Sequence, residues 1–148
     1  MPETLFQKIL VPVVTEPDAE MTCKALLPYL NRDVSEAKVI YVIEKAGGAP
    51  DKASPEQLQE EAEKIFDRVI EQFTNADFTN FETEVRYGTN VADTIVEAGR
   101  EYGASAIVFT PRGGNRWTKL FTGDVAYSLL TNTDRPVISL PPEEDSHG

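Results

Sequence analysis

The sequence predicts an α/β fold in which parallel strands form one open sheet with helices on both faces. Short apolar segments alternate with amphipathic helical patterns along the whole chain, and this order is typical of a parallel sheet with right-handed crossovers. The first and fourth apolar segments, residues 8–14 and 106–109, are the most uniformly apolar, as expected of strands that are covered on both faces. We therefore expect a five-stranded sheet in the order 3-2-1-4-5, with these two strands central.

The elements of the first half have recognisable ends. The strand at 8–14 is followed by Thr-Glu-Pro-Asp at residues 15–18, which is typical of a capping box with proline in the first helical turn. The helix that begins there carries Cys23 on its apolar face, and Pro28 should end or kink it. The second strand is expected at residues 37–43.

The second half repeats the alternation. A polar connection over residues 45–54 leads to Ser-Pro-Glu-Gln at 54–57, a second capping box before a long amphipathic helix. The third strand, 81–87, alternates apolar and charged side chains, as expected of an edge strand. Asn90 should cap the third helix. A glycine loop and a last helix follow the fourth strand, and the fifth strand is expected at 136–140.

Chain length indicates the number of domains, and net charge argues against some classes of binding partner. Residues 1–148 are expected to form a single domain, with a core over about 7–140 and a disordered acidic tail at 141–148. Acidic residues outnumber Lys and Arg by 25 to 14, and the net charge of -11 argues against partners such as nucleic acid or anionic lipid. Such acidity fits an ordinary cytosolic surface or a halophile's protein. No leader or membrane-spanning segment is visible, so a cytoplasmic protein is expected.

Histidine and cysteine are nearly absent, and the many carboxylates are scattered over predicted helix surfaces. The only histidine, His147, lies in the tail, and the only cysteine, Cys23, lies on an apolar helix face. A nucleophile–histidine pair and a zinc site are therefore not expected. The chain also lacks the glycine patterns of dinucleotide-binding and P-loop proteins and the nucleophile elbow of hydrolases. We expect no catalytic residues, no resident metal and no enzymatic turnover.

One segment does suggest a ligand. Residues 108–125 run from the end of the fourth strand through a glycine loop into the last helix. Backbone N–H groups and the positive end of a helix dipole favour an anion, and Arg112, Arg116 and Lys119 make this stretch basic in an acidic chain. These cations and the nearby Trp117 fit either a bound anionic ligand or ordinary solvated and anchoring side chains. The sequence leaves both readings open.

The spacing of this segment resembles that of the universal stress protein family. Gly113 and Gly123 enclose nine residues, as in the family motif G-x2-G-x9-G-[ST]. The opening strand, 9–13, and the closing segment, 135–140, are similar to the first and last strands of that family. The resemblance spans residues 7–140, and it implies an adenine-nucleotide site at the carboxyl ends of the first and fourth strands.

The resemblance carries the nucleotide-contacting positions of the family over to both strand ends and to the glycine loop. These positions are Pro12, Val14, Val42, Thr110, Arg112, Gly113, Gly123, Asp124 and Val125. Three of them depart from the family pattern. Val14 replaces an acid that recognises adenine, Thr110 replaces the first glycine of the motif, and Asp124 replaces its closing Ser or Thr. The resemblance thus implies a degenerate nucleotide pocket.

Asp124 has two interpretations. As a carboxylate in the first turn of a helix, it would satisfy the N–H groups there and repel phosphate. Alternatively, it would hold Mg²⁺ against the phosphates. We favour the first interpretation, in which ATP or AMP binds weakly or not at all and Mg²⁺ plays no part.

These observations favour a regulatory or ligand-sensing protein that is not a catalyst. The alternative is an ATP-binding member of the family, with Mg²⁺-assisted phosphate binding and slow or no hydrolysis. We also expect a homodimer, because the last strand would otherwise leave an apolar edge exposed and family members commonly pair there. The pairing residues would be Val137, Ile138, Ser139 and Leu140. A protein partner such as a transporter is expected if the chain acts as an interaction module.

Overall fold

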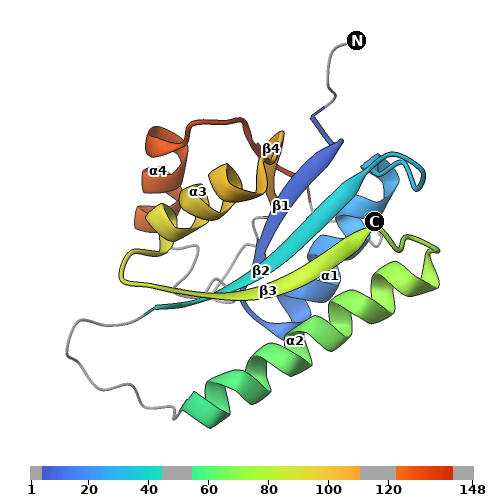
Figure 1. The fold of residues 1–148 in the computed structure, drawn as a ribbon, viewed down its shortest axis with the longest axis horizontal. Coiled ribbons are helices and arrows are strands. Elements are labelled where there is room, and N and C mark those ends of the chain that lie inside the picture. Colours follow the sequence, from blue (N-terminus) through green and yellow to red (C-terminus); the bar gives the residue numbers. More distant parts are fainter. Residues whose placement is uncertain (1–4, 45–54, 111–122, 142–148) are drawn as a thin grey trace.

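The strands confirm the predicted sheet. The computed structural model describes residues 5–44, 55–110 and 123–141, and its five strands pair in the order β3-β2-β1-β4-β5, with every pair parallel (Figure 1). The expected edge position of the third strand is therefore correct. The strands are β1 (Lys8–Val13), β2 (Glu36–Glu44), β3 (Phe81–Gly88), β4 (Ala106–Phe109) and β5 (Val137–Ser139).

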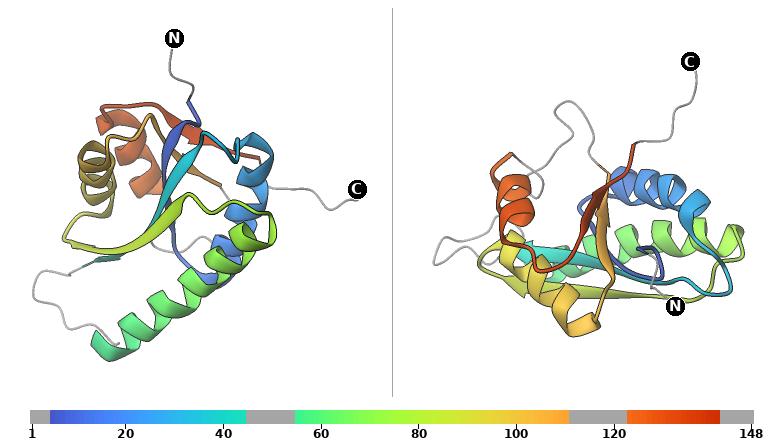
Figure 2. Two further views of the ribbon diagram at one scale, coloured as in Figure 1. Left: turned by 45° about the vertical axis from the view of Figure 1, so that its right-hand side comes forward. Right: turned by 90° about the horizontal axis from the view of Figure 1, so that it is seen from above.

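The helices form one layer on each face of the sheet. Two of them contribute side chains to one core cluster and the other two to a second cluster, and Figure 2 shows the two pairs on opposite sides of the strands. In the described ranges, no helix is both long enough and apolar enough to cross a lipid bilayer. The helices are α1 (Glu16–Leu26), α2 (Pro55–Asn75), α3 (Val91–Tyr102) and α4 (Gly123–Asn132).

β1 is the strand against which both layers pack. Ile9, Val11 and Val13 point into the core beneath α1 and α2, whereas Leu10 points into the core beneath α3 and α4, and all four side chains are fully buried. This alternation is the expected consequence of the two-residue period of a strand. A strand with both faces covered must be apolar throughout, which is why the opening segment of the sequence predicts its own central position.

The caps predicted from the sequence are present, with one difference. The Asn90 side chain accepts a hydrogen bond from Asp93 N and so begins α3. Thr15 Oγ1 likewise accepts from Asp18 N at the start of α1, but the Asp18 carboxylate bonds to the N–H of Val14 rather than returning to the cap residue itself. α1 ends at Leu26 and continues as a short 3-10 helix. The early end is explained by Pro28. The expected cap at residue 54 lies outside the described residues.

The outer strand β3 carries ion pairs on the face that it shares with α3. Lys38 Nζ lies 2.7 Å from Glu84 Oε1, and Arg86 lies 2.8 Å from the other oxygen of Glu84 and 2.6 Å from Glu101. Burial would raise the pKa of the Glu84 carboxyl, but the hydrogen bonds and charges of Lys38 and Arg86 lower it instead. The charged residues of the alternating pattern therefore stabilise one another on a half-covered sheet face.

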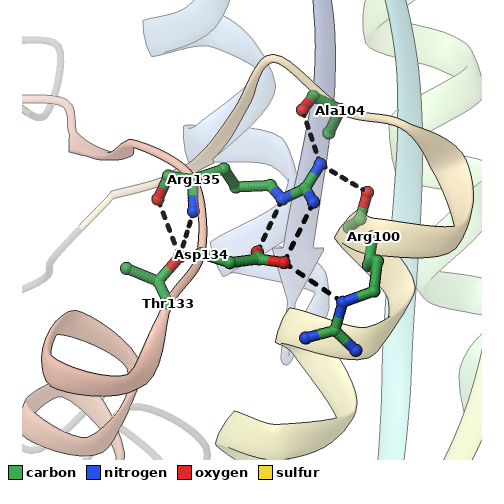
Figure 3. Close-up of polar contacts among 6 residues, drawn as sticks. Arg100, Ala104, Thr133, Asp134 and Arg135 are labelled. Carbon is green, nitrogen blue, oxygen red and sulfur yellow. Dashed lines mark hydrogen bonds and ion pairs between the residues drawn. The ribbon is translucent and has the colours of Figure 1, made fainter.

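An arginine joins the start of β5 to the end of α3. Arg135 donates to the backbone oxygens of Gly99 and Ala104 and to both carboxylate oxygens of Asp134, which also accepts from Arg100 (Figure 3). The two backbone oxygens lie at the carboxyl end of α3, where a cation is favoured by the helix dipole. Hydrogen bonds from Arg135 and Arg100 lower the pKa of Asp134. This cluster fixes the segment that leads into the edge strand.

Gly88 lets the first turn of α3 lie close to the end of β3. A Cβ atom at this position would overlap Oγ1 of Thr94, whose hydroxyl donates to Asn90 O at 2.7 Å. We predict that Gly88→Ala lowers the free energy of unfolding by about 1–3 kcal/mol, the usual cost of overpacking. Urea denaturation would measure this change. Adding Thr94→Ala should recover part of the loss, and a double mutant whose loss equals the sum of the two single losses would contradict the proposed overlap.

Candidate functional site

The ladder between β1 and β4 ends before either strand does. Their pairing covers only Ile9↔Ala106 and Leu10↔Ile107. Beyond this point β1 stays paired with β2 as far as Val13, and β4 stays paired with β5 as far as Phe109. The order of the strands reverses here, because β2 and β3 extend to one side of β1 whereas β4 and β5 extend to the other. Open α/β sheets bind ligands outside the carboxyl ends of the strands at such a point.

The turn after β1 is held by a buried carboxylate. Asp18 Oδ2 accepts from Val14 N at 2.9 Å, and Asp18 Oδ1 accepts from the Thr22 hydroxyl at 3.3 Å. Thr15 completes the turn by capping α1. The acid thus satisfies a backbone N–H at the end of β1 and a side chain one turn further along α1. A hydrogen bond to a charged group is stronger than one between neutral groups, so this carboxylate fixes the direction in which the chain leaves β1.

Thr110 follows the last residue of β4 and is 2% exposed. It lies three residues beyond Ile107, the last residue of β4 that pairs with β1. Its Oγ1 has no hydrogen-bond partner, and it is the only buried side-chain oxygen or nitrogen in the described ranges of which this is true. A buried hydroxyl without a partner costs free energy, and native structures contain few such groups.

The other predicted positions on these strands contribute apolar surface. Pro12 and Val42 are buried, and Val14 is partly buried against the core beneath α3 and α4. Phe109, next to Thr110, belongs to the same core. Val42 lies on β2, one residue beyond the partner of Val13. The described part of the site therefore combines apolar side chains with the unpartnered hydroxyl of Thr110 and the hydrogen-bonded carboxylate of Asp18.

The rest of the predicted site is described only in part. Gly123 begins α4, and Asp124 and Val125 lie in its first turn, as the sequence predicts. Arg112 and Gly113 lie outside the described residues. Whether the glycine loop meets the strand ends therefore stays a prediction.

Asp18 is a residue of the site that the sequence analysis does not predict. The sequence pattern indicates only half of a capping box there, whereas the carboxylate bonds to Val14 N and the Thr22 hydroxyl. Thr110 is among the predicted positions, as a departure from the glycine of the family motif. Its lack of a partner depends on every neighbour that the fold brings to it, so no local signal in the sequence could have revealed it.

The remaining reactive groups offer no further centre. Within the described ranges, no three His, Cys, Asp or Glu residues lie close enough together to hold a metal ion. Cys23 is fully buried. Burial raises the pKa of its thiol, and the charge of Asp18 raises it further. The thiolate, which is the reactive form of cysteine, is therefore disfavoured at this position.

Comparison with known proteins identifies the family. The profile of the universal stress protein family matches residues 5–141, nearly the whole chain. The chain belongs to the universal stress protein family. The resemblance seen in the glycine spacing and the terminal strands is thus confirmed. No curated protein shows significant sequence similarity to this universal stress protein.

Solved universal stress proteins share its fold. One from Burkholderia pseudomallei is 23% identical with a TM-score of 0.70, and the match covers 95% of this chain and 99% of that one. One from Archaeoglobus fulgidus, in complex with dAMP, is 20% identical with a TM-score of 0.62 and coverages of 93% and 99%. A universal stress protein in complex with cAMP is 15% identical with a TM-score of 0.56 and coverages of 95% and 100%.

The role of Asp18 can be tested by comparison with Asp93, which occupies the equivalent position in the first turn of α3. We predict that Asp18→Ala lowers the free energy of unfolding by about 2–3 kcal/mol, because Val14 N would lose its acceptor. Asp93 is exposed, so Asp93→Ala should change this free energy by less than about 0.5 kcal/mol. Urea denaturation of both variants provides the measurement. Similar losses in the two variants would refute the assigned role.

Proposed function

We propose that this universal stress protein is a regulatory, ligand-sensing protein without catalytic activity, and that its ligand site is an adenine-nucleotide pocket of reduced affinity. The observation that carries the proposal is the reversal of strand order between β1 and β4, whose ladder ends before their carboxyl ends. Family relatives in complex with dAMP and with cAMP support the ligand class. A change of conformation or assembly on binding would then be passed to a partner protein, such as a transporter.

The reduced affinity follows from the residues at the strand ends. Val14 stands where the family has its adenine-recognising acid, and its N–H already bonds to Asp18. The base would therefore lose one hydrogen bond, an effect of about 1 kcal/mol. Asp18 does not replace the missing acid, because its carboxylate is buried in the turn and holds Val14 N and the Thr22 hydroxyl.

Phosphate binding should be weakened as well. Asp124 lies in the first turn of α4, where the family motif has a Ser or Thr. A carboxylate at about 4 Å from a phosphate oxygen would cost roughly 1–4 kcal/mol, depending on solvent exposure. The alternative is a Mg²⁺ ion shared between this carboxylate and the phosphates. In that case the chain would bind ATP tightly and hydrolyse it slowly or not at all.

Restoring the two family residues should restore ATP binding. We predict that Val14→Asp with Asp124→Ser strengthens binding by at least about tenfold, or 1.4 kcal/mol, as measured by titration calorimetry with and without Mg²⁺. Asp93→Ser is the matched control, because it removes an acid from the first turn of another helix, and it should leave ATP binding unchanged. Tight Mg²⁺-dependent binding by the wild type that is lost in Asp124→Ser would favour the metal-assisted alternative.

The edge of the sheet at β5 supports the proposed homodimer. Pro136 O and Leu140 N bond to β4, so the N–H and C=O groups of Val137 and Ser139 point away from the sheet, since these groups alternate along a strand. Among the described strands, β5 pairs with β4 alone. A second copy could therefore add its own β5 across a two-fold axis, forming an isologous interface.

Ser139→Pro tests this pairing without removing a hydrogen bond to β4. The substitution eliminates an outward-pointing N–H, and proline is tolerated at such an edge position. We predict that it shifts the protein from dimer to monomer at micromolar concentration, as measured by light scattering, whereas Ser139→Thr leaves the dimer intact. Val137→Lys should also split the dimer. A wild-type protein that is already monomeric would contradict the homodimer.

A further inference from the structure

Thr110 is the exception among the buried polar side chains. Five polar or charged residues are buried in the described ranges. Thr22 donates to Asp18, Thr94 donates to Asn90 O, and Ser35 accepts from Asn31 N. Only the hydroxyl of Thr110 lacks a partner. Elsewhere in the described ranges, therefore, the fold satisfies the polar side chains that it buries, and the one hydroxyl that it leaves unsatisfied lies just beyond the end of β4, where the strand order reverses.

We propose that the Thr110 hydroxyl is a specificity-determining group that hydrogen-bonds the uncharged nucleoside part of a bound ligand. This inference rests on the adenine-nucleotide site proposed above. A hydroxyl can both donate and accept, so it can pair with a sugar hydroxyl or with a heteroatom of the base. The family motif has glycine at this position, and the contact would therefore distinguish this chain from relatives that follow the motif.

The charges around Thr110 favour the nucleoside over the phosphates as its partner. Residues 11–18, at the end of β1 and the start of α1, contain two acids and no Lys or Arg, and residues 108–110 contain no charged residue. Asp18 is buried in the turn that leaves β1, and Glu16, the other acid, is paired with Arg68 of α2 at 3.3 Å. These segments therefore offer no cation to a phosphate beside Thr110. The sugar and base carry no charge and need no such cation.

The proposed contact gives the Thr110 hydroxyl opposite effects on the stability of the free protein and on that of the complex. Without ligand it destabilises the fold, because it is removed from water and unpaired. With ligand it contributes a hydrogen bond. Thr110→Val keeps the shape of the side chain and removes the hydroxyl, so it should stabilise the free protein while weakening the complex. A hydroxyl with a purely structural role would not produce this combination.

The experiment measures binding of adenosine and of AMP by NMR titration, together with the thermal midpoint of each free protein. We expect Thr110→Val to raise the midpoint by about 3 °C and to weaken both ligands by the same factor, about fivefold to tenfold. Thr110→Ser retains the hydroxyl and should bind both ligands within about twofold of wild type. Thr94→Val is the matched control. It removes a partnered hydroxyl beside the end of β3, which is separated from β1 by β2, so it should lower the midpoint and leave binding unchanged.

Three results would overturn the inference. Unchanged binding of both ligands by Thr110→Val would show that the hydroxyl makes no contact with them, and the proposed nucleotide site would survive. Weaker binding of AMP with unchanged binding of adenosine would place the contact at the phosphate. Failure of the wild-type protein to bind either ligand at millimolar concentration would overturn the nucleotide site along with the role of Thr110.

Discussion

β1 has a paired strand on each side and a helical layer on each face, and the positions of the other elements follow from it. Its side chains alternate between the two cores. Its two neighbours differ in how far they follow it, because β2 pairs along its full length whereas β4 pairs with only two residues. The ladder on the β4 side of β1 therefore ends early, and Val14 and Thr110 are the residues that immediately follow these two strands.

The polar side chains that follow β1 and β4 differ in their hydrogen-bond partners. Asp18 serves the fold, since its two oxygens satisfy Val14 N and the Thr22 hydroxyl. The Thr110 hydroxyl has no hydrogen-bond partner. The first arrangement makes the turn after β1 rigid and independent of any bound molecule, whereas the second leaves free energy to be recovered on binding. A ligand that pairs with the Thr110 hydroxyl would recover the free energy that the fold loses by burying it, and the complex would gain stability from this one hydrogen bond.

The fold could be predicted from the sequence because the patterns that indicate each strand and helix involve only neighbouring residues. Uniformly apolar β1 and β4, alternating β3 and the caps at Thr15 and Asn90 each follow from neighbouring residues, and the parallel order restricts how they can be connected. The site was harder to predict, since it depends on residues that meet only after folding. Nothing near Asp18 in the sequence indicates which backbone N–H it binds. Likewise, the position of Arg135 at the end of α3 requires knowledge of how β5 enters the sheet.

The two edge strands of the sheet, β5 and β3, differ in how readily they can pair with a strand of another molecule. β5 is short and presents only the outward groups of Val137 and Ser139, whereas β3 is long but bears Glu84 and Arg86, which pair with each other and, through Glu84, with Lys38 of β2. Charged edge strands resist joining other sheets. In the proposed dimer, the two β5 edges would be consumed and only the two β3 edges would remain. Association would then end at two subunits, and a continuous sheet running from molecule to molecule, the route to fibrils, would be closed off.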